Sequence, residues 1–109
     1  MSTIRPINWN KPRTDVAERI IRQRAQDTVN IIIGAHAYER VEEREIVQAD
    51  VYKILREGYV DEVTIEPDGE WKAIVTLRLK GSREAGVVTI IFVDENTLFV
   101  KTVEWMDTI

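Results

Sequence analysis

The sequence predicts an α+β domain in which the helices come first along the chain and an antiparallel sheet follows. Between residues 15 and 58 the apolar residues recur at helical spacing, whereas after Gly58 they recur at every second position, as they do in strands. Helices and strands that are segregated along a chain are typical of helices packed on an antiparallel sheet. A chain of 109 residues is long enough for one hydrophobic core. We therefore expect N-terminal helices packed on a four-stranded antiparallel sheet.

Three helices are predicted before Gly58. The first, DVAERIIRQRAQ, begins at Asp15, which is suited to an N-cap position. The second is AHAYERVEER at residues 35–44, and the third, VQADVYKILREG, ends at Gly58, which we expect in the left-handed conformation that follows many helices. The β-branched run VNIII at residues 29–33 is either a short strand or a buried continuation, because periodicity does not separate the two.

Four strands are predicted after Gly58, connected as a meander. YVDEVTIE leads into a Pro-Asp-Gly turn, and WKAIVTLRLK then alternates between apolar and polar residues. GVVTIIFV is apolar on both faces, which is typical of a central strand, and LFVKTVEW follows the turn DENT as the last strand. These four segments supply the sheet.

Composition narrows the class of protein. Hydrophobic residues make up 44% of the chain and charged residues 31%, as in ordinary globular proteins. The chain has no cysteine, so disulfides and thiolate sites are excluded. No apolar run approaches the roughly 18–20 residues that span a bilayer, and the first residues lack the apolar segment of a signal peptide. We expect a cytoplasmic protein without membrane contact.

Charge is distributed unevenly along the chain. Residues 1–33 carry six basic and three acidic side chains, a net charge of +3, whereas residues 34–109 carry nine and sixteen, a net charge of −7. We therefore divide the chain into a basic N-terminal arm and helix, residues 1–30, and an α+β domain, residues 31–109. The basic part packs on its own acidic body or on a neighbouring copy, or else it contacts nucleic acid. Because it also carries Trp9 and the Ile20–Ile21 pair, we predict a homodimer.

Three nitrogen-rich side chains lie at steps of four residues in the second helix. His36, Arg40 and Arg44 therefore share one side of that helix. RNA is cut without a metal when a base activates the 2′-hydroxyl and cations stabilise the charged phosphorane, and histidine and arginine suit these tasks. These three are the candidate catalytic residues, and no cofactor or metal is expected, since one histidine and scattered carboxylates form no ligand set. The candidate binding residues in the sheet are Arg78, Lys80, Lys101 and Thr102.

A structural role explains the same residues equally well. Arginines beside an apolar stripe commonly pair with carboxylates, for which Glu62, Glu66 and Glu104 are available, and His36 suits a hydrogen bond at a helix end. The glutamates between His36 and Arg44 in the sequence are expected on the solvated side of the helix. The strand aromatics are expected in the core rather than on a base-stacking surface. They are Trp71, Phe92, Phe99 and Trp105.

The pattern His36-x3-Arg40-x3-Arg44-x-Ile46, followed by Asp50-Val51 and Leu55-x2-Gly58, resembles the bacterial domain-of-unknown-function family 4258. The resemblance covers about residues 31–105 and includes Thr102-Val103 in the last strand. It implies the fold of RelE-like toxins and other small metal-independent ribonucleases. It also implies a toxin-like endoribonuclease of bacterial or mobile-element origin, with RNA as its substrate and an antitoxin-like protein as a partner. The alternative is a non-catalytic binding or assembly module on the same scaffold.

Overall fold

The computed structural model describes residues 6–108, apart from the side chains of Lys80 and Thr108. The described residues form three α-helices and five strands, which confirms the α+β class. In chain order the elements are α1 (Thr14–Arg24), the 3-10 helix η1 (Thr28–Asn30), β1 (Ile31–Ile33), α2 (Ala35–Glu43), α3 (Gln48–Glu57), β2 (Tyr59–Ile65), β3 (Trp71–Lys80), β4 (Arg83–Ile91), β5 (Leu98–Trp105) and the 3-10 helix η2 (Met106–Thr108).

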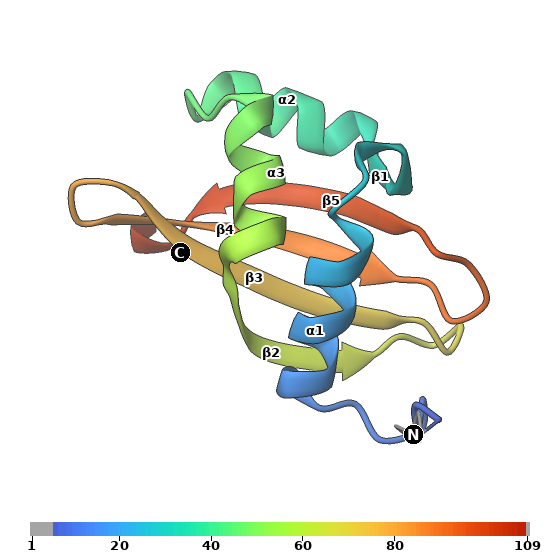
Figure 1. Ribbon diagram of the computed structural model, residues 1–109. Coiled ribbons are helices and arrows are strands. Elements are labelled where there is room, and N and C mark those ends of the chain that lie inside the picture. Colours follow the sequence, from blue (N-terminus) through green and yellow to red (C-terminus); the bar gives the residue numbers. More distant parts are fainter. Residues whose placement is uncertain (1–5, 109) are drawn as a thin grey trace.

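The sheet has five strands in the order β1-β5-β4-β3-β2 and is mixed (Figure 1). The predicted antiparallel meander is present as β2 to β5, and β4 lies inside the sheet as expected. A sheet of only four antiparallel strands was nevertheless a wrong prediction, because β1 pairs in parallel with β5 and places Ile31 opposite Leu98. Three residues are too few to display alternation, so a parallel partner 67 positions away leaves no local signal.

The helices cover one face of the sheet. In Figure 1, α1 and α3 lie across this face, while α2 lies along the edge where β5 and β1 are found. Trp71, Ala73 and Val75 alternate along β3 toward the helices and are buried in the core between the two layers. Within the described residues no α-helix covers the opposite face, which we call the open face, although Met106 of the 3-10 helix η2 lies against this face at Gly86. The described chain also has no helix that is both long enough and apolar enough to cross a membrane.

Helices α1 and α3 cap each other through arginine side chains. Arg22 of α1 donates from Nη2 to the carbonyl of Gly58, at 2.8 Å, just past the end of α3. In return, Arg56 of α3 donates from Nε to the carbonyl of Ala25, at 2.7 Å, at the end of α1. The last carbonyls of a helix lack partners within that helix and attract cations. The exchange therefore fixes the two helices to each other.

Two predicted helix ends differ from the structure. Helix α1 begins at Thr14, so Asp15 lies in its first turn, where it accepts hydrogen bonds from the Arg13 guanidinium instead of capping the helix. Gly58 has a φ of −75°, so the left-handed conformation predicted for it is wrong. Glycine is needed there for another reason: a Cβ atom would lie 2.5 Å from the carbonyl oxygen of Ile54 and 2.7 Å from that of Thr76.

The N-terminal segment packs on its own chain. Trp9 lies edge-on to Trp71 with ring centroids 4.9 Å apart, and the indole N–H of Trp71 donates to the carbonyl of Trp9 at 2.8 Å. Ile20 and Ile21 are buried in the core that α1 shares with the sheet. The apolar side chains on which the predicted homodimer depended are therefore occupied within the chain. The homodimer remains a prediction, but these apolar side chains no longer support it.

Arg24 is buried at the end of α1, where it holds the turn between β4 and β5. Its Nη1 donates to the carbonyls of Phe92, at 2.8 Å, and Thr97, at 3.1 Å. Burial lowers the pKa of the Arg24 guanidinium, and the charge of Glu70 opposes this shift. We expect Arg24→Met to lower the free energy of unfolding by about 2 kcal/mol, because two carbonyls lose a charged donor. Urea unfolding measures this loss, and Arg19→Met, at an exposed position of α1, is the control. Equal effects of the two substitutions would contradict the assignment.

Candidate functional site

Helix α2 is fastened to β5 at its N-terminal end. The N–H of Gly34, which precedes the helix, donates to the carbonyl of Val100 at 3.0 Å. A Cβ atom at Gly34 would lie 2.6 Å from Cζ of Phe99, so only glycine lets this ring approach the backbone so closely. The helix therefore starts directly beside Phe99.

The other end of α2 is fastened to β5 as well. The chain turns at Glu45, which has a φ of +58°, and the N–H of Ile46 donates to the carbonyl of Val41 at 3.2 Å. This is the 6→1 bond of a Schellman motif. The carbonyl of Arg44 points away from the helix and accepts the indole N–H of Trp105 at 2.9 Å. With both ends held, α2 runs beside β5 from Val100 to Trp105.

His36 and Arg40 are in contact with each other and accessible to solvent. The His36 side chain is 56% exposed and that of Arg40 is 32% exposed. Arg40 donates from Nε to His36 Nε2 at 3.3 Å and from Nη1 to Glu43 at 2.8 Å. Glu39 lies 4.0 Å from His36 Nδ1. The contact with Arg40 assigns Nε2 as the unprotonated nitrogen, so the imidazole presents a basic atom next to a cation.

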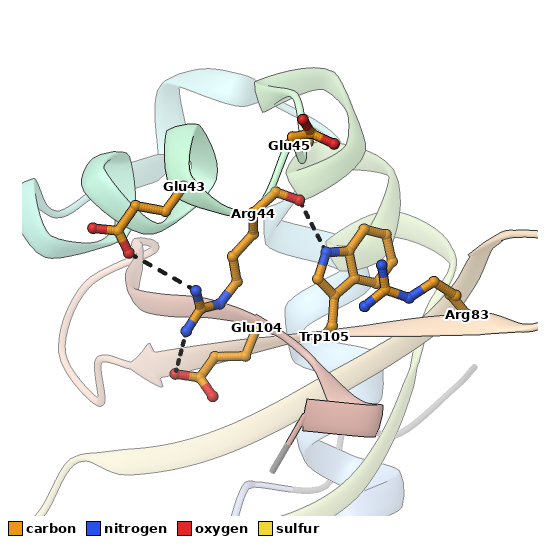
Figure 2. Close-up of a pocket in the computed structure, with 6 residues that line it drawn as sticks. All are labelled: Glu43, Arg44, Glu45, Arg83, Glu104 and Trp105. Carbon is orange, nitrogen blue, oxygen red and sulfur yellow. Dashed lines mark hydrogen bonds and ion pairs between the residues drawn. The ribbon is translucent and has the colours of Figure 1, made fainter.

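Arg44 is engaged by the protein itself. Figure 2 shows its side chain extending from the end of α2 to β5, where its guanidinium lies 3.9 Å from Glu104 and 3.8 Å from Glu43. Its Nε is buried and has no hydrogen-bond partner. Among the carboxylates considered from the sequence, Glu104 is thus a partner of Arg44, while Glu66 pairs with Lys101. A polar cavity of about 390 Å³ lies beside this pair. It is lined by Glu43, Arg44, Glu45, Arg83, Glu104 and Trp105.

The row on α2 borders the open face of the sheet. Along β5, Val103 and Trp105 are buried toward the helices, so Glu104 between them belongs to the open face. Because Arg44 reaches Glu104, the side of α2 that carries the row is the side next to the open face. From this we infer that His36 and Arg40, on the same side of α2, lie toward the rim of that face.

The strand register defines which side chains meet on the open face. Ile32 lies opposite Phe99, Phe99 opposite Ile90, and Ile90 opposite Lys72. In the neighbouring row, Thr102 lies opposite Val88 and Val88 opposite Ile74. The open face thus has an apolar centre next to α2. The members of this centre are Ile32, Ile74, Val88, Ile90 and Phe99.

The four predicted binding residues are placed unequally. Lys101 is exposed and Thr102 has a buried hydroxyl without a partner, and both lie on β5, the strand beside α2. Arg78 is exposed on β3, two strands away, opposite Glu84. The side chain of Lys80 lies outside what the structure describes. The fold therefore brings His36, Arg40 and Arg44 to the strand of Lys101 and Thr102, but it does not bring Arg78 there.

A second cavity was not predicted from the sequence. It has a volume of about 300 Å³ and lies on the open face where the β2–β3 turn approaches β5. Trp71 and Trp105 are in the core as predicted, but Phe99 is half-buried and lines this cavity. The sequence pattern did contain a signal for this position. Phe99 lies between the core residues Leu98 and Val100 on β5, so its side chain points to the opposite face of the sheet. The cavity is lined by Glu66, Pro67, Asp68, Ile90, Phe99 and Lys101.

Comparison with known protein families gives a match over most of the chain. The model of the family described as "Domain of unknown function (DUF4258)" matches residues 33–105, which include α2, α3 and the four antiparallel strands. No curated protein and no solved structure matches the chain.

Proposed function

Because the chain belongs to the DUF4258 family, whose description assigns no activity, we propose its function from the site itself: metal-independent cleavage of RNA at His36 and Arg40. The observation that carries this proposal is the 3.3 Å contact between Arg40 Nε and His36 Nε2, in an accessible position. A base and a phosphate-binding cation lie side by side at the rim of the open face. The proposal includes the RelE-like toxin relationship, action in the cytoplasm and an antitoxin-like partner.

The chemistry requires Arg40 to change partners. When a phosphodiester reaches the rim, the Arg40 guanidinium turns to the phosphate oxygens, which it binds better than a neutral imidazole. His36 Nε2 is then free to accept the proton of the 2′-hydroxyl. The 2′-oxygen attacks phosphorus, the bond from phosphorus to the 5′-oxygen breaks, and the leaving oxygen takes a proton from water. The products are a 2′,3′-cyclic phosphate and a 5′-hydroxyl.

The remaining candidates have supporting roles in this scheme. Glu39, at 4.0 Å from Nδ1, favours the tautomer in which Nδ1 carries the hydrogen. Arg44, held between Glu43 and Glu104, is a positioning residue that fixes the end of α2 on β5. Lys101 is 55% exposed and is available to a neighbouring phosphate. The net acidic charge of the body disfavours binding of RNA elsewhere on the surface.

The test uses the purified full chain and a single-stranded RNA of mixed sequence in EDTA. We expect cleavage with cyclic phosphate ends, and no cleavage of the same sequence with 2′-O-methyl sugars, because the nucleophile is blocked. Expression of the wild-type chain is expected to arrest bacterial growth. RNA that stays intact together with unimpaired growth would contradict the proposal.

A non-catalytic assembly module is the second candidate function. The engagement of Arg44 by Glu43 and Glu104 favours it, since this residue of the row fastens a helix to a sheet. Under this alternative, Arg44→Ala lowers the melting temperature by a few degrees and has no other effect. Under the enzymatic proposal, the same substitution also slows RNA cleavage, because the end of α2 moves. Cleavage rate and melting temperature, measured on the same samples, separate the two candidates.

A further inference from the structure

We propose that the cavity over Phe99 binds a guanine base of single-stranded RNA, which places the adjoining phosphate at His36 and Arg40. This inference rests on the proposed function, since it assigns the substrate of the same site. Three features of the cavity carry it: an aromatic floor, a cation at its rim and two carboxylates in its wall.

The floor of the cavity suits a flat ring. Phe99 is half-buried, with its ring edge against Gly34, and Ile90 lies opposite it on β4. Pro67 of the β2–β3 turn adds an apolar side. An unpaired base has two apolar faces and gains free energy by stacking on an aromatic side chain, whichever base it is. A volume of about 300 Å³ accommodates one base.

The polar rim distinguishes among the bases. Lys101 and Glu66 form an ion pair at 3.9 Å, longer than a hydrogen bond, so a ligand replaces this pair with direct hydrogen bonds to each group. Lys101 can bind a phosphate group, whereas the carboxylates of Glu66 and Asp68 accept hydrogen bonds from a base. Guanine offers two adjacent donors, its ring N–H and its amino group, to one carboxylate. Adenine, cytosine and uracil place a hydrogen-bond acceptor next to their donor. The second oxygen of the carboxylate repels this acceptor.

The position of the cavity connects it to the proposed chemistry. The ring of Phe99 touches the backbone at Gly34, two residues before His36 on the same chain segment. Lys101 follows Phe99 by two residues on β5, and its ammonium lies at the same cavity. A base stacked on Phe99 therefore has its sugar and phosphate at the rim that carries His36 and Arg40. An apolar sheet face can bind either RNA or another protein. The flat ring of Phe99, next to carboxylates that accept hydrogen bonds from a base, favours RNA.

The experiment measures binding separately from cleavage. The probes are fluorescein-labelled pentanucleotides UUNUU, in which N is G, A, C or U, all with 2′-O-methyl sugars that cannot be cleaved. Fluorescence anisotropy at low salt gives the affinity of the full chain for each. We expect the probe with G to bind most tightly. Phe99→Leu is expected to weaken it by about fivefold to a hundredfold, the usual loss for one stacked base. Tyr38→Leu, at a 49% exposed aromatic on another side of α2, is the matched control and is expected to change nothing.

A second variant covers the case in which Phe99→Leu disturbs the fold. The double substitution Glu66→Gln and Asp68→Asn changes two side chains at the surface turn and leaves the aromatic floor intact. We expect it to remove the preference for G while the four probes still bind. Equal affinity of the wild type for all four probes, or no binding of any probe, would overturn the base site.

The outcome for the base site is independent of the outcome for the enzyme. A chain that binds the G probe through Phe99 but leaves ribose RNA intact retains the base site and loses the proposed activity. A chain that cleaves RNA at the same rate with and without Phe99, and without a preference among probes, retains the activity and loses the base site.

Discussion

RNA cleavage by the full chain is expected to fall by about 10²- to 10⁴-fold when His36 is replaced by alanine, the usual contribution of a general base. His36 is the only histidine in the chain, and its side chain is 56% exposed, so no other imidazole takes over its task. The measurement is the initial rate on single-stranded RNA in EDTA. The melting temperature is expected to stay close to that of the wild type, because the imidazole has only one hydrogen bond among the described contacts, to the exposed Arg40.

The control for His36 lies on the same helix. Tyr38 is 49% exposed and about 160° around the axis from His36, so Tyr38→Ala truncates a comparable side chain away from the proposed site. We expect its cleavage rate to match the wild type. A His36→Ala chain that cuts RNA within twofold of the wild-type rate would remove the histidine from the mechanism.

Gly58→Ala is expected to reduce the free energy of unfolding by about 3 kcal/mol, at the upper end of the range for overpacked sites. The added Cβ would lie 2.5 Å from the oxygen of Ile54 and 2.7 Å from that of Thr76, and both are backbone atoms that rotamer changes cannot move. The end of α3 must therefore separate from β3. For a domain of this size the melting temperature should fall by roughly 12 °C or more.

A second glycine supplies the comparison for Gly58. Gly81 has a φ of +58°, and a Cβ atom there would meet nothing within 4 Å. Gly81→Ala should therefore reduce the free energy of unfolding only by the strain of the left-handed conformation, about 1 kcal/mol. Thermal and urea unfolding of the two variants test the distinction. If Gly58→Ala costs no more than Gly81→Ala, the close approach of α3 to β3 is not what requires glycine.

Local patterns in the sequence predicted most of the elements. The alternation in residues 71–80 and 98–105 gave strands with the bounds that the structure has, because a strand buried on one face must alternate. The apolar spacing after Gln48 likewise located α3. Patterns of this kind depend on residues that are close in sequence, which is why they can be read without the fold.

The candidate site was predictable in part. Steps of four residues placed His36 and Arg40 on one side of α2, and the structure has them in contact at 3.3 Å. Spacing did not reveal that Arg44 is the C-cap of that helix and that its carbonyl receives the indole of Trp105, 61 residues later. Nor did it reveal Arg24, whose carbonyl acceptors are 68 and 73 residues away.

The sequence by itself determined the α+β class, the order of helices and strands, and the His36–Arg40 pair, because each follows from helical or strand periodicity. Only the tertiary structure decided that β1 joins β5 in parallel, that Ile20, Ile21 and Trp9 pack within the chain itself, and that Phe99 lines a cavity on the open face. These features depend on contacts between distant segments. The free energy of such contacts depends on how the layers pack, and no local pattern records it.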